Sequence, residues 1–228
     1  MKKLFIWDID GTLIKGCDIG RKSMDMAFFD MYGIKNAFDG IDMAGRVDSN
    51  ILRDAYELHN ICNRDSSTYF NRYAIRLDDE FKKLDFSIEV PGILQLLNIL
   101  SNIPDFFSVL GTGNTEKAAR IKLAYHNMNN YFPTGGFGDK EQERWQVIQE
   151  SIENSKNFFN TNFTNDNIYV IGDTPRDIEC GRKLGVKTVA VATGYFSYSQ
   201  LKTYSADYLL ESFSIPEDFF KNLNLSVS

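Results

Sequence analysis

Short apolar runs that end at turn-forming residues recur along the chain. Residues 4–9 form the first run, and the turn residues 10–12 follow it directly. Similar runs at residues 106–110, 168–171 and 188–191 each end at a segment that contains glycine, and residues 206–210 form a weaker fifth run. Short apolar runs bounded in this way predict buried strands.

Helical spacing follows most of these runs. Residues 116–125 place Ala119, Leu123 and Ala124 on one side of a helix, and residues 175–184 predict another helix. Strands that alternate with helices predict an α/β fold, with a parallel sheet covered by helices on both faces. The polar residues 155–167, which are rich in Asn, Thr and Phe, predict a connecting surface loop.

The alternation stops between residues 18 and 89. Residues 24–31 and 51–58 have apolar positions at helical spacing, Asp48 and Asp65 suit helix N-caps, and no strand is predicted. We therefore expect a small α-helical cap domain over residues 17–88. It is inserted into an α/β core made of residues 1–16 and 89–228, with hinges near residues 15–16 and 87–91.

Composition narrows the class of protein. The 228 residues, 43% of them hydrophobic, suffice for one core and a small insertion, and the net charge of −6 disfavours general nucleic-acid binding. A small phosphorylated metabolite still fits one locally positive pocket. Three dispersed cysteines without a CxxC pair, and no long apolar stretch, indicate a cytoplasmic protein without a membrane segment. Monomer and homodimer both remain open.

Two acids stand at the end of the first predicted strand. Residues 8–13 read Asp-Ile-Asp-Gly-Thr-Leu, so Asp8 and Asp10 lie two positions apart where a buried run turns. A structural interpretation makes Asp10 the start of an Asx-turn. However, a charge at the end of a buried run is costly unless it is paired or bound to a metal, which favours a functional site.

The second predicted strand ends at residues 111–114, Gly-Thr-Gly-Asn. The segment lacks the third glycine of a dinucleotide-binding loop and the ending of a P-loop. It suits a tight turn capped by Asn114 or Thr115. It equally suits a loop in which Thr112, Gly113 and nearby backbone N–H groups face a phosphate oxygen.

Two further groups follow. Residues 172–177, Gly-Asp-Thr-Pro-Arg-Asp, place Asp173 and Asp177 about one helical turn apart, which suits metal binding. The same pattern suits an N-cap at Asp173 with Pro at an early helical position. Lys140 and Arg144 precede or begin another predicted helix, and either is a candidate cation or a solvated surface charge.

Taken together, these motifs resemble those of the haloacid dehalogenase superfamily, in its phosphatase branch with a helical cap after the first motif. The resemblance covers nearly the whole chain. Residues 8–13 and 172–177 match closely, and residues 110–114 match loosely. The superfamily usually has a lysine, often followed by proline, between the second and the last of these motifs, and no Lys-Pro occurs there in this chain. Arg144 is the better match and Lys140 the alternative. The resemblance implies a Rossmann-like core and similarity to phosphoglycolate phosphatases.

The resemblance also implies a mechanism. Asp8 is the expected nucleophile, which forms an aspartyl-phosphate, and Asp10 is the expected general acid and base. Mg²⁺ is expected on Asp8, the Asp10 backbone carbonyl and Asp173, with Asp177 in or near its shell. In this superfamily, dehalogenases lack an acid two residues after the nucleophile. Asp10 therefore favours a phosphate ester, whose leaving alkoxide needs a proton.

Substrate binding is expected at Thr112, Gly113 and Asn114, with Arg144 or Lys140 on the phosphoryl oxygens. Residues 44–48 resemble a segment of phosphoglycolate-phosphatase-like members, so Arg46 is either a substrate ligand or a surface charge. The alternatives are a phosphomutase of the same superfamily, which would return the phosphoryl group to a sugar, and a catalytically silent binding or regulatory protein. The sequence leaves the phosphate ester unidentified.

Overall fold

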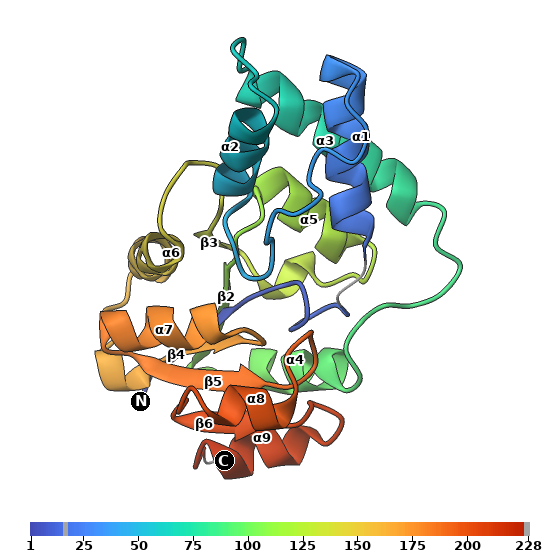
Figure 1. Cartoon of the computed structure of the whole chain (residues 1–228). Helices are drawn as coiled ribbons and strands as arrows, with labels where there is room; N and C mark the ends of the chain where they lie inside the picture. Colours follow the sequence, from blue (N-terminus) through green and yellow to red (C-terminus); the bar gives the residue numbers. More distant parts are fainter. Residues whose placement is uncertain (16–17, 226–228) are drawn as a thin grey trace.

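One six-stranded sheet organises the computed structural model, which describes residues 1–15 and 18–225 (Figure 1). Every neighbouring pair of strands is parallel, and β1 lies between β2 and β4. Among the described residues, a helix with the length and hydropathy of a membrane span is absent.

In sheet order the strands are β3 (Gly135–Gly136), β2 (Phe106–Gly111), β1 (Lys3–Trp7), β4 (Ile168–Gly172), β5 (Lys187–Val191) and β6 (Tyr208–Leu210). The helices are α1 (Ile19–Tyr32), α2 (Asp48–Leu58), α3 (Ser66–Phe81), α4 (Ile93–Ser101), α5 (Glu116–Ala124), α6 (Arg144–Phe159), α7 (Pro175–Leu184), α8 (Tyr198–Lys202) and α9 (Pro216–Asn222).

The central strand buries both of its faces. Successive side chains of a strand point to opposite faces, so Leu4 and Ile6 pack on one side of β1 while Phe5 and Trp7 pack on the other. Helices α6 and α7 cover the first side, and α4, α5 and α9 cover the second. A strand that is apolar on both faces needs helices on both, which confirms the predicted α/β fold.

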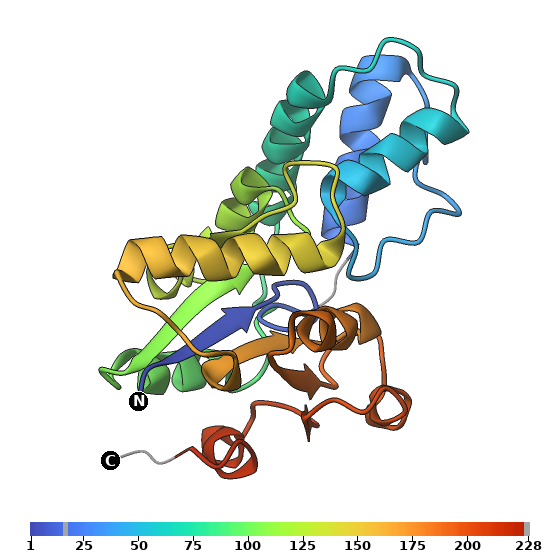
Figure 2. The ribbon, with the colours of Figure 1, turned by 90° about the vertical axis from the view of Figure 1, so that its left-hand side faces the viewer.

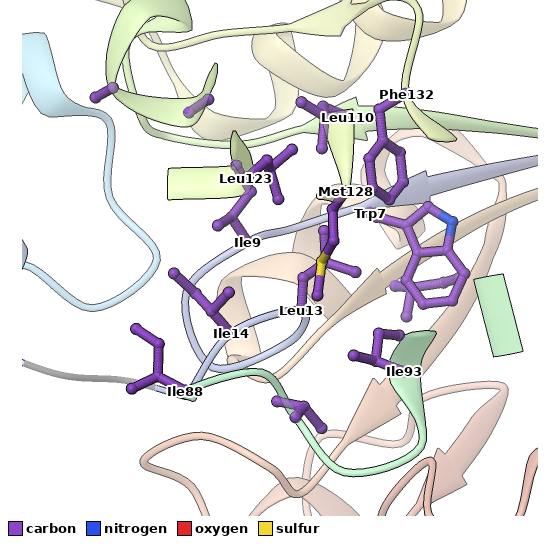
Figure 3. Packing of buried hydrophobic residues seen from close by; sticks show 14 of the residues in the cluster. Trp7, Ile9, Leu13, Ile14, Ile88, Ile93, Leu110, Leu123, Met128 and Phe132 are labelled. Carbon is purple, nitrogen blue, oxygen red and sulfur yellow. The ribbon is translucent and has the colours of Figure 1, made fainter. Parts of the chain in front are cut away.

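The turn after β1 is anchored by apolar side chains (Figure 3). Ile9, Leu13 and Ile14 are fully buried, and they belong to the same cluster as Leu110 of β2 and Leu123 of α5. Burying an aliphatic side chain stabilises the fold by roughly 1.5–3 kcal/mol. These anchors therefore hold the turn, and the acids on it, in one place relative to α5.

Three helices stand apart from the sheet. Helices α1, α2 and α3 form a group beyond the sheet in both views, with α1 packed on α3 and α3 in contact with α5 (Figures 1 and 2). The two chain segments that join this group to the sheet run side by side. Val90 N–H donates to the Leu13 carbonyl (3.0 Å), and Lys15 N–H donates to the Ile88 carbonyl (2.6 Å). Gly16 of the predicted hinge lies outside the described residues.

Two local predictions were wrong. Residues 155–167 are not simply a surface loop, because α6 continues to Phe159. Its Ser151 and Ser155 are buried, and the Ser155 hydroxyl donates to the Ser151 carbonyl one turn earlier (2.6 Å). Asp65 is the N-cap of α3 as predicted, whereas Asp48 is the first residue of α2 and its carboxylate bonds outside that helix.

Gly92, at the start of α4, shows how tightly the chain closes against the C-terminal segment. Its φ is +83°, and a Cβ there would lie 1.9 Å from the backbone oxygen of Phe213. Gly40 has nearly the same φ, +81°, but no neighbour within 4 Å of a Cβ.

We predict that Gly40→Ala lowers the free energy of unfolding by about 1–2 kcal/mol, the cost of a Cβ in the left-handed conformation. Gly92→Ala should lose roughly 1–3 kcal/mol more, because its Cβ also overlaps the backbone. Urea unfolding of both variants and the wild type measures the difference. Equal losses would contradict the backbone contact.

Candidate active site

A tight loop presents two acids at the carboxyl end of the central strand. Asp8 follows β1 directly, and its N–H donates to the Ile171 carbonyl on β4 (3.0 Å). Ile9 turns into the core, and its carbonyl accepts hydrogen bonds from the backbone N–H groups of the three residues from position 12 to 14. Gly11 takes the left-handed conformation (φ +82°). Asp8 is buried, whereas the Asp10 side chain is 43% exposed.

A second loop brings two more acids to Asp8. Asp8, Asp173 and Asp177 are all buried, and each offers a carboxylate oxygen within 4.8 Å of the others. Asp173 lies between two glycines. A Cβ on Gly11 would lie 2.3 Å from the Asp173 Oδ2, and a Cβ on Gly194 would lie 1.7 Å from it. Only residues without a side chain leave room for this carboxylate.

Arg144 supplies positive charge to this group. Its Nη2 donates to Asp177 Oδ1 (3.1 Å) and to the Gly111 carbonyl (2.9 Å), and it lies 2.9 Å from Asp8 Oδ1 in an ion pair. Its Nε and Nη1 are buried and have no hydrogen-bond partner among the described residues. The guanidinium therefore retains donors for a further acceptor beside Asp8.

Desolvation dominates the electrostatics of the acids. Burial raises the pKa of Asp8 above its ordinary value, although Arg144 acts in the opposite direction. Burial, followed by the charges of Asp177 and Asp8, raises the pKa of Asp173. The three carboxylates offer only oxygen ligands. The single positive charge of Arg144 does not balance their negative charges. Such a set fits a hard divalent cation such as Mg²⁺.

Asp177 orients the guanidinium from the first turn of α7. One of its oxygens accepts from Arg144, and the other accepts from the N–H (3.2 Å) and hydroxyl (2.7 Å) of Thr174. Thr174 is the N-cap of α7 and Pro175 follows it, so the structural interpretation of Asp173 as N-cap is wrong. Asp173 is instead left to face Asp8.

The loop after β2 lies beside the same site. The hydroxyl of the buried Thr112 accepts from the backbone N–H (3.3 Å) and side-chain Nδ2 (2.8 Å) of Asn114. A Cβ on Gly113 would lie 3.0 Å from Arg144 Nη1 and 1.9 Å from the Arg46 carbonyl oxygen. Thr115 caps α5, which was one of the two caps the sequence left open.

Lys122 of α5 also belongs to the site, although no motif in the sequence pointed to it. Its Nζ donates to both oxygens of Asp10 (2.8 and 2.6 Å) and to Asn114 Oδ1 (2.7 Å). Burial alone would raise the pKa of Asp10, but Lys122 and then Asn114 lower it overall. The available signal was helical spacing, because Lys122 follows the buried Ala118 and Ala119 by four and three positions.

The other two candidate cations, Lys140 and Arg46, pair with acids outside the group around Asp8. Lys140 is exposed and pairs with Glu150 (3.2 Å), away from the acids, so the structure brings Arg144 and not Lys140 to Asp8. The Arg46 guanidinium pairs with Asp54 (2.6 Å) and the Asp42 carbonyl (3.0 Å). Arg46 also lines a cavity of about 380 Å³ together with Arg53, Arg144, Trp145, Arg176 and Lys183.

The segment that begins α2 docks onto the loops of the core. Asp48 N–H donates to the Gly113 carbonyl (2.8 Å), and its carboxylate accepts from Thr115 N–H (2.9 Å). The Ser49 hydroxyl donates to the Gly138 carbonyl (2.8 Å). Burial raises the pKa of Asp48 from 3.8 to about 7, despite the opposing charge of Lys122.

A parallel sheet with buried carboxylates and a guanidinium at the carboxyl ends of its strands is the arrangement of an open α/β protein that binds ligands at that edge. A comparison with known protein families identifies the family within this class. The family model described as "haloacid dehalogenase-like hydrolase" matches residues 5–191, and the chain belongs to this hydrolase family. The resemblance seen in the sequence is thereby confirmed.

Solved structures share the fold. A predicted phosphatase from Clostridium acetobutylicum is 20% identical (TM-score 0.66), and the comparison covers 97% of this chain and 99% of that one. A hydrolase from Pseudomonas syringae is 16% identical (TM-score 0.71), covering 96% and 98%. A predicted phosphoglycolate phosphatase from Haemophilus somnus 129PT is 16% identical (TM-score 0.66), covering 96% and 97%. No curated protein matches the chain significantly.

We predict a pH dependence of stability that comes from Asp48. The folded chain keeps the Asp48 proton up to about pH 7, whereas the unfolded chain releases it near 3.8. The folded state thus binds more protons in that window, and the free energy of unfolding falls as pH rises through it. Asp48→Asn lacks this contribution.

Urea unfolding between about pH 4 and pH 8 should show the wild-type stability falling relative to Asp48→Asn, with the difference levelling above about pH 7. The exposed N-cap variant Asp65→Asn is the control, and its difference from wild type should not follow this course. A difference between wild type and Asp48→Asn that stays constant over the whole range would contradict the burial of Asp48 as an acid.

Proposed function

We propose that the protein is a Mg²⁺-dependent phosphatase that hydrolyses the phosphate monoester of a small metabolite, with Asp8 as nucleophile. The observation that carries this proposal is the convergence of Asp8, Asp173 and Arg144 at the end of β1, with Asp10 two residues from the nucleophile. Phosphoryl transfer needs positioning and charge neutralisation above all, and these residues supply both. The family and its phosphatase-named structural neighbours agree with the proposal.

Asp8, Asp173 and the backbone carbonyl of Asp10 would hold the ion, with Asp177 behind them. The fit rests on the buried carboxylate group and on the two glycines that make room for Asp173. When bound, Mg²⁺ would neutralise the negative charge that otherwise keeps a phosphate away from Asp8. Asp177 is already engaged with Thr174 and Arg144, so its contribution is to orient the guanidinium.

The chain's own groups then carry two displacements. An Asp8 oxygen bonds to phosphorus as the ester P–O bond breaks, and the protonated form of Asp10 gives its proton to the leaving alkoxide oxygen. Asp10 next takes a proton from water, whose oxygen attacks phosphorus and releases inorganic phosphate and free Asp8. Arg144, with two unpaired donors beside Asp8, and the loop from Thr112 to Asn114 would hold the remaining phosphoryl oxygens.

The inserted residues 17–88 would act as the cap of a core made of residues 1–16 and 89–228. The two chain segments that join the helices α1–α3 to the sheet lie side by side, linked by the hydrogen bonds of Lys15 with Ile88 and of Val90 with Leu13. Such a pair of connecting segments is suited to act as a hinge. Arg46 lines a cavity together with Arg144, which supports a role for Arg46 in binding a second acidic group of the substrate. The ion pair with Asp54 would have to open for that contact.

We predict that Mg²⁺ raises the melting temperature of the wild type, because an ion that binds only the folded state stabilises it by about 2.7 kcal/mol at one hundred times its Kd. Asp173→Asn should lose most of this shift. It should also melt no lower than wild type without the ion, because a repulsive charge is gone. The exposed Asp85→Asn is the matched control and should keep the shift. A full shift in Asp173→Asn would count against this metal site.

The function itself is tested by a panel of phosphate esters with Mg²⁺, with wild type, Asp8→Asn and Asp85→Asn assayed side by side. We expect turnover of at least one ester, abolished by EDTA and by Asp8→Asn but not by Asp85→Asn. Activity that survives in Asp8→Asn would refute the nucleophile. A stable phospho-enzyme that needs a bisphosphorylated sugar for turnover would indicate a mutase, and no turnover of any ester would indicate a binding protein.

A further inference from the structure

The site contains a second buried cation, which contacts Asp10. Lys122 is 4% exposed, and its ammonium donates to both Asp10 oxygens and to Asn114 Oδ1. Burying an ammonium is costly unless it is paired and hydrogen-bonded, so its partners here are a requirement of the fold as well as of the site. Arg144 contacts the proposed nucleophile, whereas Lys122 contacts the proposed acid and base.

The helix places Lys122 with little freedom. Ala118, Ala119 and Leu123 on the same helix are fully buried, and Leu123 packs in the cluster that includes Ile9 (Figure 3). Ile9 lies between the two acids of the loop. Because one apolar cluster anchors both the helix and the loop, the ammonium and the Asp10 carboxylate are fixed relative to each other.

Asn114 closes the arrangement. Its Nδ2 donates to Asp10 Oδ2 (2.8 Å) and to the Thr112 hydroxyl (2.8 Å), while its Oδ1 accepts from Lys122. Two side chains, Asn114 from the loop after β2 and Lys122 from α5, therefore restrain the Asp10 carboxylate. Without Lys122, one Asp10 oxygen would keep Asn114 as its partner and the other would be left to water.

We propose that Lys122 is a positioning residue, which holds the Asp10 carboxyl group at the place where it meets the leaving oxygen of the substrate. This inference rests on the proposed function. In the first displacement the P–O ester bond breaks, the Asp8–phosphorus bond forms and the Asp10 proton moves to the leaving oxygen. Lys122 keeps its own protons and acts through Asp10.

A positioning role has a chemical consequence that packing alone lacks. An alkoxide is a poor leaving group and depends on the proton from Asp10, whereas p-nitrophenolate leaves as a stable anion and depends on it little. A misplaced Asp10 therefore harms alkyl phosphates selectively. Damage to folding or to the phosphoryl site would harm both kinds of ester equally.

The test compares kcat/KM of wild type and Lys122→Met for p-nitrophenyl phosphate and for an alkyl phosphate that the wild type hydrolyses. General acid catalysis contributes roughly 10²–10⁴-fold, so we expect a loss of about tenfold or more with the alkyl ester and at most about threefold with the nitrophenyl ester. Lys117→Met is the matched control, because Lys117 is an exposed residue of the same helix. Equal losses on both esters would overturn the proposal.

Chemical rescue and a crystal structure test the role of Lys122 independently of the comparison of the two esters. If Lys122→Met does not fold, Lys122→Ala is assayed with added ethylammonium, which should restore activity with the alkyl ester, while ethanol should not. Restoration by both, or by neither, would count against the charge of Lys122. A crystal structure of whichever variant folds should show the Asp10 carboxylate turned from its wild-type position about its remaining bond to Asn114, and an unmoved carboxylate would refute the positioning role even if no ester were hydrolysed. Failure of the proposed function is seen separately, as wild type inactive on every ester.

Discussion

The mutual repulsion of three buried carboxylates at the end of the central strand is the constraint on which the rest of the structure depends. Asp8, Asp173 and Asp177 approach within 4.8 Å, and burial raises the pKa of the first two. Such a group persists only if cations offset it. Arg144 supplies one positive charge, and the remaining deficit is the physical reason for assigning a divalent ion to this place.

The fold holds the three carboxylates in place through contacts with the core, with glycines and with a helix N-terminus. The loop that carries Asp8 is fixed by apolar anchors, Asp173 is enclosed by two glycines, and Asp177 is tied to the N-terminus of α7. Two cations divide the site between them, with Arg144 on the proposed nucleophile and Lys122 on the proposed acid and base. Preorganised charges of this kind need no rearrangement during reaction, which is where electrostatic catalysis gains most.

Much of this was accessible from the sequence, because the relevant signals are local. Apolar runs that end at residues 10–12, 111–114 and 172–177 predicted strands, and parallel strands bring their carboxyl ends to one edge. Lys122 was missed because its partner, Asp10, is 112 positions away, and only packing of α5 on the loop joins them. Likewise β3, two glycines long, has no apolar pattern, and α6 reaches Phe159 through polar residues that the fold buries. The boundaries of the cap remain a prediction.

The most direct measurement is a crystal structure of the protein grown with Mg²⁺ and beryllium fluoride, a mimic of a phosphoryl group on a carboxylate. We expect one ion in contact with both Asp8 and Asp173, and the beryllium fluoride group attached to an Asp8 oxygen and facing Arg144. An ion bound elsewhere, or a fluoride group on any residue other than Asp8, would contradict it.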